Sequence, residues 1–429
     1  MELLQIAKNA KQAALELSSI SSATKDNALK AIAGAIEKNK EAILKENRKD
    51  VAQAEKQGIV DALVKRLSLN EYKIKEMVHG IHDLIKQEDP VGKTLATLEL
   101  DKDLLLYQVS TPIGVIGAIF ESRPDATVQV ACLCLKSGNA AILKGGKEAL
   151  NTNKLLVKLM NEAAEKAGIP KYSIQLIETR EEVREMLKLG SYIDLLVPRG
   201  SNKFVKFIQD NTKIPVLGHS EGICHLYVDK EADMKQAVEI AFDAKCQYPA
   251  VCNAIETMLV HKDIAKAFLP KIAAKYKEAN VELRGDKKTR AILHGIKAAT
   301  EKDWGTEYND LILSIKVVDS AEEAIKHINT YGSKHTESIV TENPKTAYIF
   351  MDKVDAATVM HNASTRFSDG YRFGKGAEVG ISTSKLHARG PVGLEGLVIY
   401  KYKVVGKGHV VKDYTGKNAK TFTHRRLDK

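Results

Sequence analysis

The sequence predicts an α/β protein with two doubly wound, mainly parallel sheets. From residue 113 onward, short apolar runs such as "IGVIGAIF" and "IPVLG" predict strands and alternate with helical segments such as "DATVQVACLCLKSG". A second alternating block runs from about residue 224 to 360, with "CHLYVD" and "ETMLVH" as strands. Fully apolar runs are typical of parallel strands buried on both faces, and repeated β–α–β units build such sheets. The length of 429 residues suits two or three domains.

The segments before and after these blocks follow different patterns. Residues 1 to about 90 show helical spacing, with one apolar face formed by Leu29, Ile32, Ala33 and Ile36. "LATLELDKDLLLYQVSTP" alternates and predicts a β-hairpin with "DKD" as its turn. The late run "GPVGLEGLVIYKYKVVG" predicts a strand with no neighbour nearby in sequence. That strand must pair with the hairpin at 98–110 or with a second subunit.

Composition narrows the function classes. The net charge is +10, but acidic residues are interspersed throughout, so solvated surfaces explain it as well as an anionic ligand does. The sequence has no nucleic-acid motif and no apolar run long enough for a membrane span. Five scattered cysteines predict free thiols in a reducing cytoplasm. HExxH and CxxC spacings are missing, so we expect no metal site.

One thiol stands apart from the other four. Cys252 lies in "QYPAVCNAIETMLV", where a loop turns into a strand. Cys132 and Cys134 fall inside a predicted helix, and Cys224 begins an apolar strand, positions typical of packing. From position alone, Cys252 is either a nucleophile or a further packing residue.

A phosphate site is predicted after one of the strands. No GxGxxG follows the first strand, and a P-loop is also missing. In "LLVPRGSNKFVKFI", a strand ends at Pro198, and Arg199, Gly200 and Ser201 form a turn into a helix beginning at about Ser201. Backbone N–H groups at such a helix start can bind phosphate, although Ser201 could equally be an ordinary N-cap.

Two lysines lie at the end of a neighbouring strand. In "ILKGGKE", Lys144 occupies the carboxyl edge of the strand, where ligands bind in open α/β sheets. Lys147 follows three residues later. The alternative for both lysines is simple solvation.

Several longer segments resemble one family. They are "IFESRPDATVQVACLCLKSGNAAILKGGKE", "LLVPRGSNKFV", "CNAIETMLV", "GSKHTESIVTEN" and "KLHARGPVGLEGL", in the family's order over nearly the whole chain. The sequence resembles the γ-glutamyl phosphate reductases of the aldehyde dehydrogenase superfamily. The resemblance implies a cofactor-binding domain (1–97, 111–223 and 359–396), a catalytic domain (224–358) and an oligomerisation β-arm (98–110 and 397–415).

The resemblance also implies a reaction. In the family, NADPH reduces L-glutamyl 5-phosphate to L-glutamate 5-semialdehyde and phosphate, the second step of proline biosynthesis from glutamate. Cys252 would be the nucleophile and carry a thioester, because a thiol is both a strong nucleophile and a workable leaving group. The Cys252 N–H together with Asn253 or Arg123 would hold the oxyanion. Aldehyde-oxidising relatives carry a water-activating Glu where this chain has His219; Glu221 is out of register.

The substrate is strongly anionic, so cationic residues in family motifs are candidates for binding it. These are Arg123, Arg366, His387 and Arg389; the arginines could instead form structural salt bridges, and His387 could instead cap a turn.

For the cofactor, the resemblance implies Lys144 at the adenosine ribose and Arg199, Gly200 and Ser201 at the phosphates. Lys144 and Lys147 could neutralise a 2′-phosphate, which would favour NADP over NAD.

Two rival functions remain at this point. One is an ordinary aldehyde-oxidising dehydrogenase on the same fold, and the other is a basic binding or scaffold protein with an inert Cys252. We expect a homo-oligomer, and any glutamate 5-kinase would have to be a separate partner protein.

Overall fold

The N-terminal region of the computed structural model is helical, as the spacing predicts. The structure describes residues 2–121, 123–219 and 221–427. The first five helices are α1 (Leu3–Leu17), α2 (Ser22–Lys38), α3 (Lys40–Lys56), α4 (Asp61–Leu67) and α5 (Glu71–Lys86). In α2, the predicted apolar face is buried: Leu29, Ile32, Ala33 and Ile36 are each at most 1% exposed. This face belongs to the same core as the first sheet.

The first sheet is parallel, with strand order β5-β4-β3-β6. Its strands are β3 (Val115–Phe120), β4 (Ala140–Lys144), β5 (Ile174–Leu176) and β6 (Leu195–Arg199). The connecting helices are α6 (Pro124–Lys136), η1 (Lys147–Ala149), α7 (Leu150–Lys166), α8 (Arg180–Met186) and α9 (Asn202–Asp210). The strand expected in "IPVLG" is wrong as a full strand, because only Val216 bridges to Leu196.

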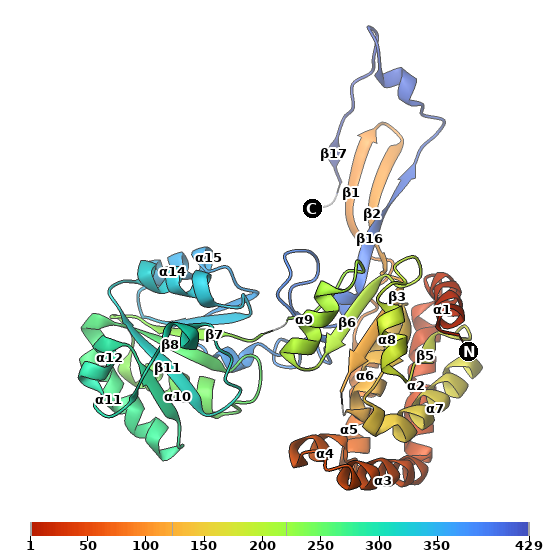
Figure 1. Ribbon diagram of the computed structural model, residues 1–429. Helices are drawn as coiled ribbons and strands as arrows, with labels where there is room; N and C mark the ends of the chain where they lie inside the picture. The colour runs from red at the N-terminus through yellow and green to blue at the C-terminus, as the bar shows by residue number, and fades with distance from the viewer. Residues whose placement is uncertain (1, 122, 220, 428–429) are drawn as a thin grey trace.

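The second sheet is also parallel, with strand order β10-β9-β11-β8-β7-β12-β13. Its strands are β7 (Cys224–Val228), β8 (Ile255–His261), β9 (Glu282–Gly285), β10 (Lys297–Ala298), β11 (Ile312–Val318), β12 (Thr336–Val340) and β13 (Thr358–His361). Its helices are α10 (Met234–Cys246), α11 (Lys262–Glu278), α12 (Lys287–Ile292), α13 (Glu301–Trp304), α14 (Ala321–Tyr331) and α15 (Pro344–Lys353). Figure 1 shows two α/β bodies side by side.

One expected domain boundary needs correction. The resemblance places the end of the second α/β domain at residue 358, but β13 continues to His361 and pairs along its length with β12. Backbone hydrogen bonding therefore holds residues 359–361 in the second sheet. Residues from 377 to 397 pack instead against the core of the first sheet.

A third, antiparallel sheet projects from the first α/β body (Figure 1). Its strands are β1 (Thr94–Asp101), β2 (Leu104–Pro112), β16 (Val398–Val405) and β17 (Arg425–Arg426), in the order β16-β2-β1-β17. The late strand β16 pairs with the hairpin strand β2, from Val398 opposite Pro112 to Val405 opposite Leu105. The strands run from Thr94 to Pro112, in agreement with the hairpin predicted in "LATLELDKDLLLYQVSTP" and beyond the 98–110 given for the β-arm. We call these four strands the projecting sheet.

The remaining elements lie between the second sheet and the projecting sheet in sequence, or follow β16. They are η2 (Thr365–Phe367), β14 (Gly380–Ser382), β15 (Gly390–Val392), η3 (Leu394–Leu397) and η4 (Val411–Tyr414). Strands β14 and β15 pair with each other. Among the described helices, none combines the length and apolarity that crossing a membrane requires.

Candidate active site

Cys252 lies in the loop between α10 and β8, packed tightly against Gly222. A β-carbon placed on Gly222 would come within 2.6 Å of Cα of Cys252 and still closer to its carbonyl oxygen, so only glycine fits there. The N–H of Gly222 donates to the Glu307 carboxylate at 3.0 Å. Gly222, two residues before β7, therefore fixes the backbone of the thiol loop.

The five thiols differ in environment. Burial raises the pKa of Cys132 to about 12 and the pKa of Cys246 to about 11. Burial likewise raises the pKa of Cys134 and of Cys224. Cys252 is only partly buried. Since the thiolate is the nucleophile, the other four thiols are held in the unreactive form near neutral pH.

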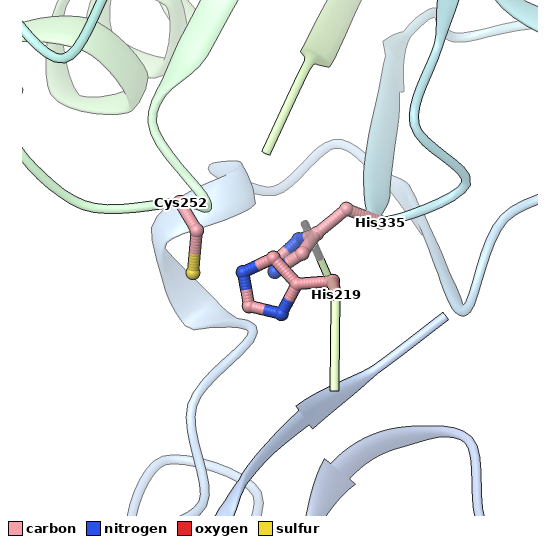
Figure 2. A group of neighbouring side chains, drawn as sticks. All are labelled: His219, Cys252 and His335. Atoms are coloured by element: carbon pink, nitrogen blue, oxygen red, sulfur yellow. The ribbon is translucent and has the colours of Figure 1, made fainter. Parts of the chain in front are cut away.

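Two histidines lie beside Cys252 (Figure 2). One ring nitrogen each from His219 and His335 and the Cys252 sulfur all lie within 4.8 Å of one another. The two rings meet edge to face, with centroids 4.6 Å apart. His219 comes from the segment after the first sheet and His335 directly precedes β12, so the tertiary fold alone brings them together. The sequence indicates His219 only as the residue near the missing Glu. His335 lies in the family segment "GSKHTESIVTEN", but the sequence alone predicts no role for it.

Burial sets the charge of both imidazoles. It lowers the pKa of His219, against the opposing effect of a hydrogen bond to the Ile381 carbonyl. It also lowers the pKa of His335, against the opposing effect of the Cys252 sulfur. Both rings are therefore neutral at pH 7 and can accept a proton.

The Asn253 side chain holds the thiol loop in place. Its Nδ2 donates to the Ser368 carbonyl at 2.8 Å, and its Oδ1 accepts a hydrogen bond from Arg366. Arg366 is buried and also donates through Nε to Gln247 at 2.9 Å. Burial, and then the neighbouring Arg372, lower the pKa of Arg366. Asn253 and Arg366 are thus joined in one network directly behind the nucleophile.

Arg366 also faces a groove of about 600 Å³. The groove is further lined by Arg372, Gln247, Asp243 and Ser364. Arg366 therefore combines a structural hydrogen bond with access to a space large enough for a small anionic ligand.

Arg199 is the last residue of β6. Its Nη1 is buried and has no hydrogen-bond partner in the described part of the chain. Burial lowers the pKa of Arg199 most, the charge of Arg123 adds to this, and Glu378 and Cys252 act in the opposite direction. The guanidinium therefore shares its electrostatic surroundings with the nucleophile.

Arg123 and Glu378 complete this charged group. Arg123 precedes α6 and forms an ion pair with Asp125 at 2.8 Å. Burial raises the pKa of Glu378, and the charge of Arg199 opposes that rise. Sequence reasoning missed Glu378, which lies in the Gly-rich segment before β14 and carries no motif of its own.

Other predicted cofactor residues gather at the carboxyl edge of the first sheet. Lys144, at the end of β4, pairs with Ile119 of β3, and Arg199, at the end of β6, pairs with Phe120. Burial lowers the pKa of Lys144, and the charge of Glu148 opposes this. Lys147 is exposed at the start of η1.

The turn before α9 is open to a ligand. Helix α9 begins at Asn202, one residue later than expected, and Ser201 is its N-cap. The Ser201 side chain is exposed and makes no capping hydrogen bond, so its hydroxyl is available. A β-carbon on Gly200 would lie 3.1 Å from Phe204 and 3.2 Å from the Glu121 carboxyl carbon. This edge has the strand–turn–helix geometry that binds phosphate groups.

His387 and Arg389 lie in a separate hollow of about 350 Å³, which Lys375 and Lys385 also line. His387 Nε2 is 2.9 Å from the Val398 carbonyl oxygen, and Arg389 forms an ion pair with Asp355 at 3.0 Å. Among the described residues, no hydrogen bond or ion pair links either side chain to Cys252 or its two histidines. The structural alternative for Arg389, a salt bridge, is thus present.

The fold and the thiol site define a class of protein. The sequence profile of the aldehyde dehydrogenase family matches residues 1–294. Two parallel α/β bodies with a partly exposed cysteine in the second body fit that class.

The relatives narrow the class further. A γ-glutamyl phosphate reductase from Methanosarcina acetivorans is 58% identical over 429 residues, covering 98% of this chain and 96% of that protein. One from Pelotomaculum thermopropionicum is 56% identical, covering 100% and 98%. The crystal structure of γ-glutamyl phosphate reductase from Thermotoga maritima superposes with a TM-score of 0.94 at 45% identity, covering 96% of this chain and 100% of that one. The chain therefore belongs to the γ-glutamyl phosphate reductases of the aldehyde dehydrogenase family, a family of oxidoreductases that use NAD or NADP.

Proposed function

We propose that this chain reduces L-glutamyl 5-phosphate to L-glutamate 5-semialdehyde and phosphate with NADPH, the second step of proline biosynthesis. The proposal rests on one observation above all. Cys252, the partly exposed thiol of the catalytic loop, stands between two proton acceptors and a group of arginines, in a chain 58% identical to a protein named for this reaction.

In this account Cys252 attacks the acyl carbon of the substrate. The S–C bond forms, the C–O bond to phosphate breaks, and phosphate leaves a thioester on Cys252. The Cys252 N–H supports the oxyanion, with Arg123 as the side-chain candidate. Asn253 now acts chiefly by positioning the loop, because its carbonyl oxygen is engaged by Arg366 and its amide nitrogen bonds the Ser368 carbonyl.

The anionic substrate needs cationic partners. Arg199 is the strongest candidate for the phosphate, since its unpaired, buried Nη1 needs an acceptor and a phosphate oxygen supplies one. We therefore move Arg199 from the cofactor site to the substrate site. Arg366 and Arg123 are further candidates, whereas His387 and Arg389 would serve only a substrate group that reaches their separate hollow.

The cofactor residues keep the roles implied by the resemblance. Lys144 would hold the ribose, and Gly200, Ser201 and the start of α9 would hold the phosphates. Lys147 is exposed beside this edge and would neutralise a 2′-phosphate, which favours NADP. The reduced cofactor, when bound, supplies the hydride that converts the thioester to a thiohemiacetal.

We also propose that the projecting sheet is an oligomerisation arm. Side chains on β16 are exposed in the single chain, including Tyr402 at 58% and Val404 at 56%. Large apolar side chains in this number on a projecting strand are typical of a subunit contact.

The cellular setting is part of the same proposal. A reducing cytoplasm suits the five free thiols. Association with a separate glutamate 5-kinase would supply the unstable acyl phosphate directly.

An aldehyde-oxidising dehydrogenase is the second candidate, because the neutral histidines beside Cys252 could activate water. One assay separates the two functions. The protein receives glutamate 5-semialdehyde and NADP, with and without inorganic phosphate, beside a Cys252→Ala control. Our proposal predicts steady reduction of NADP only with phosphate and none in the variant. Equal steady rates without phosphate would establish hydrolysis of the thioester instead.

A further inference from the structure

The two imidazoles and the Cys252 sulfur come from three segments that are far apart in the sequence. His219 follows the first sheet, Cys252 precedes β8, and His335 precedes β12. One ring nitrogen of each histidine and the Cys252 sulfur lie within 4.8 Å of one another (Figure 2). Catalytic hydrogen bonds are often long in ligand-free structures and shorten when substrate binds, so proton transfer here needs the side chains to approach or one water to bridge them.

The tautomer of His219 follows from its hydrogen bond. Its Nδ1 lies 2.8 Å from the carbonyl oxygen of Ile381 in β14. A carbonyl oxygen can only accept, so Nδ1 carries the proton and Nε2 of the neutral ring is an acceptor. Figure 2 shows the ring nitrogen remote from β14 directed toward the Cys252 sulfur.

One ring nitrogen of His335 lies beside the same sulfur. The side chain is fully buried, and its Nδ1 lies 2.9 Å from the Thr336 hydroxyl. Its Nε2 has no hydrogen-bond partner in the described part of the chain. Buried unpaired nitrogens are rare in native proteins and point to a functional role. When Nδ1 donates to the Thr336 hydroxyl, Nε2 is a proton acceptor.

The charged groups around the pair come from every neighbouring segment. Glu307 and Glu378 act on His219 in one direction and Arg199 in the other. Cys224 lies 3.6 Å from His335 Nδ1. The two carboxylates and the guanidinium thus have opposite effects on the pKa of His219, and both rings lie beside the nucleophile.

We propose that His219 and His335 act together as the general base and acid for Cys252, which deepens the proposed function and rests on it. As the S–C bond forms and the C–O bond to phosphate breaks, the thiol proton passes to an imidazole and from the imidazole to the leaving phosphate oxygen. Hydride addition to the thioester leaves an oxyanion; as this collapses to the aldehyde the C–S bond breaks, and the Cys252 thiolate takes a proton from solvent through the imidazole. The pair ends each turnover as it began.

The test measures the rate at which iodoacetamide alkylates Cys252 between pH 6 and 8, with EDTA present throughout. Transfer of the thiol proton to an imidazole during the attack removes the need for prior ionisation of the thiol, so the wild-type rate should change little with pH. Without the base, reactivity should rise about tenfold per pH unit, as for a simple thiol. The double variant His219→Gln, His335→Gln should therefore react at least about tenfold more slowly at pH 6.5.

The control is His361→Gln, an exposed histidine on β13 of the same sheet, whose profile should match the wild type. If the double variant has the melting temperature of the wild type and also the pH profile of the wild type, the proposal is overturned. If the double variant does not fold, the single variant His219→Gln is tested instead, because His219 is only partly buried and its replacement should disturb the fold less. It should slow alkylation at pH 6.5 at least about threefold, and an unchanged profile would again overturn the proposal. Alkylation needs no substrate. The alkylation rates can therefore be interpreted even if the protein shows no phosphate-dependent activity.

Discussion

Gly222 leaves no room for a side chain beside Cys252: a β-carbon there would lie 2.6 Å from Cα of Cys252. Gly222→Ala should therefore displace the nucleophile loop. A shift of about 1 Å at a reacting group can cost about a hundredfold in rate, so kcat/KM should fall at least about tenfold. Steady-state kinetics of the phosphate-dependent reaction measure this.

The control for that change is Gly34→Ala. Gly34 is exposed in α2, and a β-carbon at this position would meet nothing within 4 Å. Alanine there should stabilise the helix by about 0.5–1 kcal/mol without loss of activity. Equal kcat/KM for Gly222→Ala and the wild type would show that the loop tolerates displacement.

Replacing Arg199 and replacing Lys147 should raise the KM of different substrates. Arg199→Gln should raise the KM for phosphate in the reverse reaction by about tenfold or more, the value of a lost charged hydrogen bond. Its KM for NADP should stay within about threefold. Lys147→Ala should show the opposite pattern. If Arg199→Gln weakens NADP and leaves phosphate unchanged, Arg199 belongs to the cofactor site after all.

Thiol reactivity should single out Cys252. Burial raises the pKa of the other four cysteines, to about 11 for the least buried of them, Cys246. A limiting amount of iodoacetamide at pH 7.5 should therefore label the peptide containing Cys252 at least about tenfold faster than any other. Peptide mass spectrometry reads the result, and preferential labelling of Cys246 would contradict the assignment.

His327 should make folding stability depend on pH. Burial lowers its pKa to about 2, whereas an unfolded histidine titrates near 6.5. Below about pH 6.5 the unfolded chain therefore binds the extra proton, and the stability linked to this group is lost as pH falls toward 2. The loss is about 1.4 kcal/mol per pH unit.

Replacing His327 should make the free energy of unfolding depend less on pH. His327 packs against the rings of Trp304 and Tyr331, so His327→Phe keeps an aromatic ring there. Urea unfolding between pH 6 and 4 should show a slope smaller by about 1.4 kcal/mol per pH unit in this variant than in the wild type. The same slope in both proteins would refute the burial argument.

The projecting sheet should control assembly. Tyr402 and Val404 lie on one face of β16 and are exposed in the single chain. The double change Tyr402→Asp, Val404→Asp should give single chains in light scattering coupled to size-exclusion chromatography. Lys403→Asp, on the opposite face of the same strand, should leave the oligomer intact. An oligomer that survives the double change would place the contact elsewhere.

Local patterns were enough to predict much of the fold. The apolar runs at β3 and β8 and the helical face of α2 follow from burial at short range, and the structure contains all three. Even the pairing of β16 with the hairpin could be named as one of two options, because an unpaired strand needs a partner. The strand predicted at "IPVLG" does not form, because a single bridge between Val216 and Leu196 is too little to make a strand.

The arrangement of the site depends on tertiary contacts that no local pattern contains. The charges that act on Arg199 come from Arg123, Asp125 and Glu378, on other segments of the chain. The pairing of His219 with His335 needs both sheets to be in place, and the tautomer of His219 depends on the Ile381 carbonyl of β14. The sequence motif was enough to predict Cys252 as the nucleophile. It was not enough to predict which side chains lie around Cys252.

The most direct test of the account is to look for the thioester on Cys252. The protein is mixed with glutamate 5-semialdehyde and NADP without phosphate, quenched in acid and examined by peptide mass spectrometry. We predict a burst of one reduced cofactor per chain and a glutamyl group on the peptide containing Cys252, and adding phosphate before the quench should remove it. Turnover with no adduct, or an adduct on another cysteine, would contradict the account.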